Sequence, residues 1–298
     1  MAFGGLFQHT ISAPAALTGV GVHTGEHVRV TVRPAPVNTG VVFVRTDVTD
    51  RDNRVTVQGD AVVKTQLGTV IGNAAGVTVS TVEHLLSAMC ALGVDNAVIE
   101  VDGPEVPIMD GSALPFVRAL DRVRLRPQAA DRRYIEIVAA ITVTDGDKRA
   151  ALLPADGFEA SFKIAFPSTA IGHQQVSFDG SEAAYRAAIA PARTFGFVQE
   201  VEALRRIGLA RGGSLANAIV IDGDRILNPE GLRFPDEFVR HKLLDAIGDL
   251  YVLGAPILGR FEGVLAGHGL NNQLVRAVMA QPHAWRWRTP AEAMAQAV

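Results

Sequence analysis

A histidine and two aspartates recur at helical spacing in residues 235–254, where they could bind a metal ion. If this segment is a helix, its apolar residues form one face, and His241, Asp245 and Asp249 follow the other. His241 and Asp245 are four residues apart, so both side chains can reach the same ion. Imidazole and carboxylate are ligands that suit zinc. The alternative is a solvated face that carries these residues by chance, and spacing alone favours that alternative.

The segment STVEHLL at residues 80–86 places a second histidine beside a glutamate. Ser80 and Glu83 match a capping box, so Glu83 could simply cap the start of a helix. His84 precedes two leucines and could be a histidine of the core. The segment has only one histidine and therefore lacks the His-Glu-x-x-His zinc motif. A metal ion here would need further ligands, which the helix at residues 235–254 could supply.

Together, His84, His241 and Asp245 would provide three ligands and leave a fourth position open, as a catalytic zinc ion requires. Zinc lowers the pKa of a bound water to about 7, and Glu83 would take the proton as that water attacks a carbonyl. A further polar group must meet the developing charge and the leaving nitrogen. The candidate is His268, in AGHGLNN at residues 266–272; the alternative is a turn histidine between glycines.

Strands and helices from both halves of the chain must position these residues. The first half predicts strands at residues 28–32, 41–44 and 97–101, and helices at 82–91 and 114–121. The second half predicts strands at 134–143 and 158–165, and helices near 181–189, 197–207 and 237–253. Residues 122–133 are basic, contain Pro127 and break the apolar pattern, which indicates a linker.

This order of elements predicts an α+β protein with two similar domains, residues 1–126 and 131–280. A tail follows at residues 281–298. We interpret it as mobile up to a short helix that Thr289 and Glu292 open with a capping box. Trp285 and Trp287 alternate with arginines there, and a contact with a membrane surface is the alternative interpretation.

Composition excludes several classes of protein. The chain has 298 residues, of which 48% are hydrophobic and 20% charged, as in globular proteins with ample core. The net charge of −3 argues against a nucleic-acid surface, and the single cysteine, Cys90, excludes an intramolecular disulfide. The longest apolar runs have about half the length that spans a bilayer, and the N-terminus lacks the features of a signal peptide. We expect a cytoplasmic monomer.

Seven long motifs connect the chain to a known family. They are TGVGVHTG (18–25), STVEHLL (80–86), DNAVIEVDGPEVPIMDGS (95–112), ARTFGF (192–197), NPEGLRF (228–234), DEFVRHKLLDAIGDL (236–250) and GHGLNN (267–272). With them the chain resembles the zinc-dependent UDP-3-O-acyl-N-acetylglucosamine deacetylases of lipid A biosynthesis over about residues 8–278. The resemblance implies a zinc site formed by His84, His241 and Asp245, with Glu83 as general base. It also implies that His268 assists the leaving amine and the oxyanion.

The resemblance assigns further residues to the reaction and to the substrate. Asp249 would orient His268, and the Thr194 hydroxyl would hydrogen-bond the tetrahedral intermediate. Basic residues associated with the nucleotide sugar would be Lys242, Lys148 and His23. An apolar passage for the acyl chain would be lined by Phe195, Phe197, Val201 and Leu204.

The resemblance also implies the fold and the reaction. Each domain would pack two helices on a sheet, with the helices sandwiched between the outer sheets, so that the polar stripe of residues 237–253 lines the cleft. The reaction would be zinc-dependent removal of the N-acetyl group of UDP-3-O-(3-hydroxyacyl)-N-acetylglucosamine, with release of acetate. Residues 166–171, Ala216 and Gly269 depart from the usual family pattern and affect only peripheral substrate contacts.

Two alternatives stay open at this point. One is a zinc amidase that acts on an acetylated substrate without a nucleotide; the basic residues Lys148, Lys242 and His23 favour a diphosphate instead. The other is a carrier of lipids or nucleotide sugars without catalytic activity. The complete ligand set together with Glu83 argues against a carrier.

Overall fold

The computed structural model describes residues 5–290 and 292 and contains helices and several sheets, which confirms the predicted α+β class. The first large sheet has the order β2-β3-β9-β4-β5. Its strands are β2 (Ala15–Val20), β3 (His27–Pro34), β4 (Val41–Arg45), β5 (Arg54–Thr56) and β9 (Ala97–Val101). Alternate residues of β3, Val28, Val30 and Val32, are buried, because successive side chains of a strand point to opposite faces.

The second large sheet is built from the other half of the chain. It has the order β12-β13-β19-β11-β20, and β14 pairs with β19 and β15. The bounds are β11 (Tyr134–Ile137), β12 (Ile141–Asp145), β13 (Lys148–Leu153), β14 (Phe158–Ala165), β15 (His173–Phe178), β19 (Ile257–Val264) and β20 (Trp285–Arg288). The single strand predicted at residues 134–143 is therefore two strands, β11 and β12.

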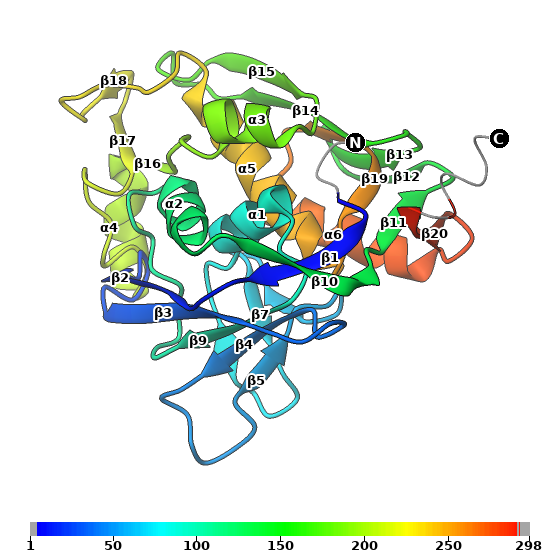
Figure 1. The fold of residues 1–298 in the computed structure, drawn as a ribbon. Coiled ribbons are helices and arrows are strands. Elements are labelled where there is room, and N and C mark those ends of the chain that lie inside the picture. The colour runs from blue at the N-terminus through cyan, green and yellow to red at the C-terminus, as the bar shows by residue number, and fades with distance from the viewer. Residues whose placement is uncertain (1–4, 291, 293–298) are drawn as a thin grey trace.

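Four helices lie between these two sheets (Figure 1). They are α1 (Glu83–Leu92), α2 (Leu114–Val123), α5 (Glu237–Tyr251) and α6 (His268–Ala280). Helix α2 contacts β2 of the first sheet, whereas α5 and α6 contact strands of the second. The helices thus form an inner layer, as the resemblance implied. The predicted domain boundaries remain a prediction.

Helices α1 and α5 come from different halves of the chain and meet closely at the centre. All ten residues of α1 are buried. A Cβ placed on Gly248 of α5 would lie 2.0 Å from the backbone oxygen of Glu83, at the start of α1. Only a glycine leaves room for this approach, so the two helices bring their side chains to one point.

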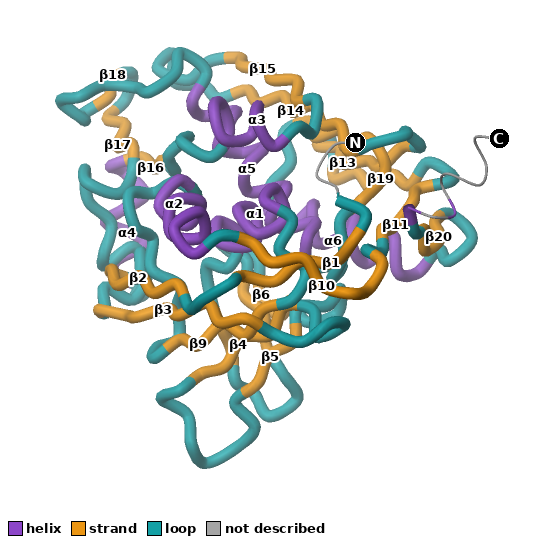
Figure 2. Tube along the Cα trace, in the orientation of Figure 1, coloured by secondary structure: helices purple, strands orange, loops and turns teal. Residues whose placement is uncertain are grey.

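The remaining elements are small and lie around this frame (Figure 2). β1 (Phe7–Ile11) pairs with β10 (Leu125–Asp131), and β6 (Val62–Lys64), β7 (Val70–Gly72) and β8 (Thr78–Val79) form a three-stranded sheet. A third small unit contains β16 (Phe195–Phe197), α4 (Val198–Arg206), β17 (Ile219–Asp222) and β18 (Arg225–Ile226). The predicted helix near residues 181–189 is a short α3 (Glu182–Ala184) that continues as a π-helix, Tyr185–Ile189.

Two segments differ from the expectation drawn from the sequence. The predicted linker at residues 122–133 is mostly strand β10, which pairs antiparallel with β1. Part of the predicted mobile tail is β20, whose residues pair with β11, and the indole Nε1 of Trp285 donates to Val278 O at 2.8 Å. The capping box is confirmed, since Glu292 Oε2 accepts from the Thr289 backbone N at 2.8 Å. The rest of that predicted helix lies outside the described residues.

Candidate active site

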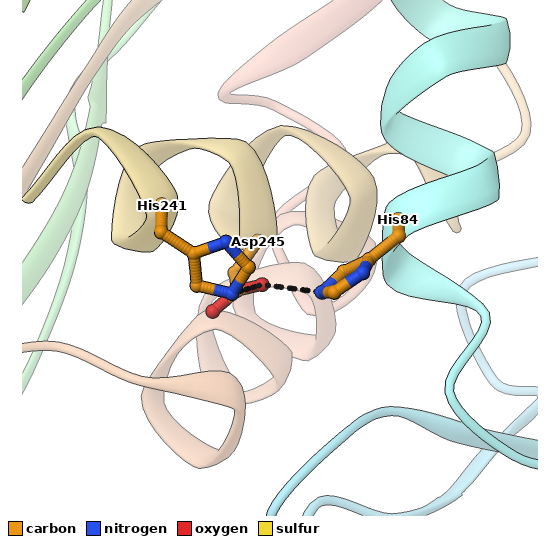
Figure 3. A group of neighbouring side chains, drawn as sticks. All are labelled: His84, His241 and Asp245. Atoms are coloured by element: carbon orange, nitrogen blue, oxygen red, sulfur yellow. Dashed lines mark ion pairs between the residues drawn. The ribbon is translucent and has the colours of Figure 1, made fainter. Parts of the chain in front are cut away.

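The two predicted histidines and the predicted aspartate come together where α1 meets α5. Figure 3 shows His84 projecting from α1 towards His241 and Asp245 on α5. Asp245 Oδ1 lies 3.4 Å from His84 Nε2 and 3.2 Å from His241 Nε2. All three residues are buried, and their ligand atoms lie within 4.8 Å of one another. The alternative of a solvated face on α5 is therefore wrong.

The tautomer of His241 can be read from its surroundings. Its Nδ1 lies 3.1 Å from the carbonyl oxygen of Ala192, and because a carbonyl only accepts, Nδ1 carries the proton. Burial lowers the pKa of His241 to about 3, so the ring is neutral and Nε2 presents a bare lone pair to the Asp245 carboxylate. Two acceptors that face each other in a buried site are unfavourable, and a cation between them removes the conflict. These residues fit a zinc ion.

Asp245 is held in its ionised form. Burial alone would raise the pKa of this carboxyl, but the Lys242 ammonium group and the His268 ring keep it well below the usual range. Lys242 Nζ donates to Asp245 Oδ2 at 2.8 Å. The oxygen that faces the two histidines, Oδ1, is therefore a charged ligand.

Glu83 is the first residue of α1, and its side chain is buried beside the candidate metal ligands. Its Oε2 accepts a hydrogen bond from the backbone N of Thr69 at 2.9 Å. The capping alternative is wrong, because α1 begins at Glu83 itself and the Ser80 N–H donates to Pro104 O. Burial raises the pKa of Glu83, which makes it a better proton acceptor than an exposed glutamate.

His268 is the first residue of α6 and lies across the site from Glu83. Its Nδ1 is 2.9 Å from Asp249 Oδ2, so Asp249 is placed to orient the ring. Burial alone would lower the pKa of His268, but the Asp249 carboxylate, with Asp245 and Glu83, raises it to about 9. One ligand atom each from Glu83, Asp245 and His268 lies within 4.8 Å of the others. A base and a protonated histidine therefore flank the same small space.

A cavity of about 380 Å³ opens onto these groups. Thr194 lines it, and so does the apolar set predicted for the acyl passage, Phe195, Phe197, Val201 and Leu204. Helix α4, which carries the last two, has no buried residue. Its apolar face is thus not covered by the core. The rings of Phe195 and Phe166 pack edge to face, with centroids 5.7 Å apart, and Phe195 also contacts His241.

The basic residues predicted for the nucleotide sugar fall into two groups. His23 and Lys242 line the cavity, and His23 Nε2 lies 3.2 Å from Leu67 O. Lys148 does not line this cavity; it is exposed at the β12–β13 turn and forms an ion pair with Asp145 at 3.7 Å. Because Arg149 pairs with Val264, this turn adjoins the chain that leads into α6.

Two buried charges that support the site were not found from the sequence. Arg193 Nε donates to Glu237 Oε1 at 2.9 Å, which ties the segment containing Ala192 and Thr194 to the start of α5. Glu105 accepts hydrogen bonds from the His23 and Thr24 backbone N–H groups and so fixes that loop. Arg193 and Glu105 both lie inside the long motifs. A charged residue in a sequence does not by itself indicate that it is buried, or which distant residue it pairs with.

The fold and this arrangement define a class of protein: an α+β hydrolase with a candidate metal centre between its helices. The family model described as UDP-3-O-acyl N-acetylglycosamine deacetylase (LpxC) matches residues 8–280, and the chain belongs to this family. The resemblance drawn from the motifs is confirmed.

Curated relatives cover nearly the whole chain. A UDP-3-O-acyl-N-acetylglucosamine deacetylase of Phenylobacterium zucineum (strain HLK1) is 70% identical over 293 residues, which are 98% of this chain and 100% of that protein. A protein of the same name from Shewanella sp. (strain W3-18-1) is 50% identical over 282 residues, 94% of this chain and 92% of the relative. Within residues 5–290 and 292, none of the helices has the length and apolar character that a bilayer span requires.

Proposed function

We propose that this chain is a zinc-dependent deacetylase that removes the N-acetyl group of UDP-3-O-(3-hydroxyacyl)-N-acetylglucosamine and releases acetate, a step of lipid A biosynthesis. The observation that carries the proposal is the convergence of His84, His241 and Asp245 beside Glu83 and His268 at one end of an apolar cavity. The family and the printed names of the relatives support the same reaction.

The residues divide the reaction between them. When bound by His84, His241 and Asp245, zinc supplies Lewis acidity that activates water and polarises the amide carbonyl. Glu83 accepts the proton of the attacking water, for which its raised pKa suits it. His268, protonated at neutral pH because its pKa is raised to about 9, donates a proton to the leaving nitrogen.

Other residues orient these groups and stabilise charge. Asp249 accepts from His268 Nδ1 and so directs Nε2 towards the reacting atoms. Thr194 lines the cavity and donates its hydroxyl proton to the oxygen of the tetrahedral intermediate. Lys242 lies next to Asp245 and contacts the sugar from the wall of the cavity.

The two ends of the substrate occupy different surfaces. The acyl chain lies along Phe195, Phe197, Val201 and Leu204, where its methylene groups leave water. His23 and Lys148 contact the nucleotide part, with Lys148 reaching it from the β12–β13 turn outside the cavity. We further propose that the protein acts as a monomer in the cytoplasm.

Single replacement of the ligands tests the metal assignment. His84→Ala, His241→Ala and Asp245→Ala should each lose most bound zinc and most acetate release, because each removes one of three protein ligands. His173→Ala, on the exposed face of β15, is the matched control and should keep both. Full zinc occupancy in all three ligand variants would contradict the assignment.

Substrate analogues that lack UDP test the proposed recognition of the nucleotide. Acetate release should fall sharply when the substrate lacks UDP, because the cations that meet the diphosphate then have no partner. Equal release from an acetylated sugar without UDP would favour the alternative of a general zinc amidase.

A further inference from the structure

Thr69 lies between the two halves of the proposed proton-transfer machinery. It directly precedes β7 and is 2% exposed. Its backbone N donates to Glu83 Oε2 at 2.9 Å. Its hydroxyl Oγ1 donates to Asp249 Oδ1 at 2.5 Å. Thr69 therefore makes two hydrogen bonds, one to the proposed base, Glu83, and one to Asp249, the carboxylate that orients the proposed acid.

The hydroxyl bond completes the environment of Asp249. The other oxygen of this carboxylate, Oδ2, accepts from His268 Nδ1 and from Asn271 Nδ2, both at 2.9 Å. With Thr69 on Oδ1, both oxygens are held and the carboxylate cannot rotate without breaking a bond. Hydrogen bonds to a charged acceptor are the stronger kind, so this restraint is substantial.

The segment around Thr69 is also packed directly against the base. A Cβ placed on Gly68 would lie 3.0 Å from Glu83 Oε1. The carbonyl oxygen of Leu67 lies 3.2 Å from His23 Nε2, at the rim of the same cavity. Residues 67–69 thus contact the base, the partner of the acid and a residue that lines the cavity.

We propose that Thr69 is a positioning residue that fixes Glu83 and the Asp249–His268 pair in one arrangement. This inference rests on the proposed roles of Glu83 and His268. Proton transfer requires both groups at hydrogen-bond distance from the reacting atoms, and small displacements reduce the rate strongly. Thr69 itself does not touch the substrate in this account; it acts through Asp249.

The central test compares Thr69→Val with Thr69→Ser. Valine keeps the shape and the backbone N–H but removes the hydroxyl, so kcat should fall about 10- to 100-fold, the usual effect of losing an outer hydrogen-bond partner. KM and bound zinc should not change, since neither the cavity nor the metal ligands are altered. Serine restores the hydroxyl and should recover most of kcat.

Thr10→Val is the matched control for stability. Thr10 is also buried; its Oγ1 donates to Asn96 O at 2.7 Å and accepts from the Ala35 N–H at 3.0 Å, and neither partner is a proposed site residue. Thr69→Val removes the hydroxyl bond to Asp249 and Thr10→Val removes two buried hydroxyl bonds, but only Thr69→Val should lower kcat. If kcat falls equally in both variants, or if serine does not restore it, Thr69 has only a structural role and the inference is overturned.

A double-mutant cycle tests whether Thr69 acts through Asp249. In an Asp249→Ala background, Thr69→Val should cause little further decrease in kcat, because the group it positions is gone. A full additional decrease would overturn the inference. The outcome is separable from failure of the proposed function: if Glu83→Gln loses turnover while Thr69→Val keeps it, the function stands and the role of Thr69 does not.

Discussion

His241 and Glu83 are buried in one site and have opposite tasks. His241 donates from Nδ1 to the Ala192 carbonyl, which leaves Nε2 free to bind a cation. Glu83 keeps one oxygen on the Thr69 N–H, and its raised pKa favours taking a proton. In each residue, a hydrogen bond to the backbone occupies one side-chain atom and leaves the other, His241 Nε2 or Glu83 Oε1, available for the reaction.

Glu83→Gln separates the role of Glu83 as a base from its role in the structure. Glutamine can still accept from the Thr69 N–H through its amide oxygen, so the melting temperature should barely change. It cannot accept a proton, so turnover should fall by roughly two to four orders of magnitude. Acetate release and thermal unfolding measure the two effects. A variant with normal turnover and a lowered melting temperature would show that Glu83 is structural.

At the scale of elements, the approach of α1 to α5 creates the site. Gly248 allows this approach, because any side chain there would overlap the Glu83 backbone. The site residues His84 and His241 lie on these two helices, so the spacing between the helices fixes the spacing between the ligands.

Gly248→Ala should separate the helices and destabilise the protein by about 1–3 kcal/mol, the range for overpacking. It should also weaken zinc binding. Gly269→Ala is the matched control, since a Cβ on this residue of α6 meets its nearest neighbour, Thr65 Oγ1, at 3.6 Å, an ordinary contact. That variant should be as stable as the parent or more so, since alanine favours a helix. Equal stability of both variants in denaturant unfolding would contradict the close-approach argument.

Helix α4 provides the second test at this scale. Val201→Glu and Leu204→Glu should reduce kcat/KM for the long-chain substrate and leave the melting temperature unchanged, because neither residue is buried in the core. Ala203→Glu, exposed on the same helix, is the control and should have no effect.

Shortening the 3-O-acyl chain probes the same surface, since each buried CH₂ contributes about 0.8 kcal/mol. Removing about ten carbons should therefore lower kcat/KM by several orders of magnitude, less the effect of incomplete burial. Equal kcat/KM with and without the acyl chain would contradict the assignment of these residues to an acyl passage.

The sequence predicts some elements well and others poorly, for physical reasons. Helix α5 was predicted within about two residues of its ends, because its apolar face repeats with the helical period. For strand β10 the sequence predicts a linker instead, because the stability of this strand comes from pairing with β1, more than a hundred residues earlier in the chain. The composition of the segment itself does not indicate a partner strand that lies so far away in the sequence.

The same limit applies within the site. Residue type and spacing make His84, His241 and Asp245 candidates, the resemblance implies that they form a zinc site, and the structure brings them together. The roles of Thr69 and Arg193 depend on contacts with Asp249 and Glu237, residues far away in the chain. A threonine before a short strand and an arginine in a loop have no pattern of their own that predicts these contacts.

At the scale of the whole molecule, neither half of the chain contains a complete site. Glu83 and His84 come from the first half, and His241, Asp245 and His268 come from the second. The inner layer of helices between the two sheets brings these residues together (Figure 1). Metal binding and catalysis should therefore depend on the assembled molecule.

The most direct test measures zinc and acetate on the same purified protein. We predict about one zinc ion per chain, as expected for a single three-ligand catalytic site, and acetate release from UDP-3-O-(3-hydroxyacyl)-N-acetylglucosamine. A chelator should remove both, and one equivalent of zinc should restore both. Undiminished acetate release from protein shown to contain no transition metal would contradict a zinc-dependent deacetylase.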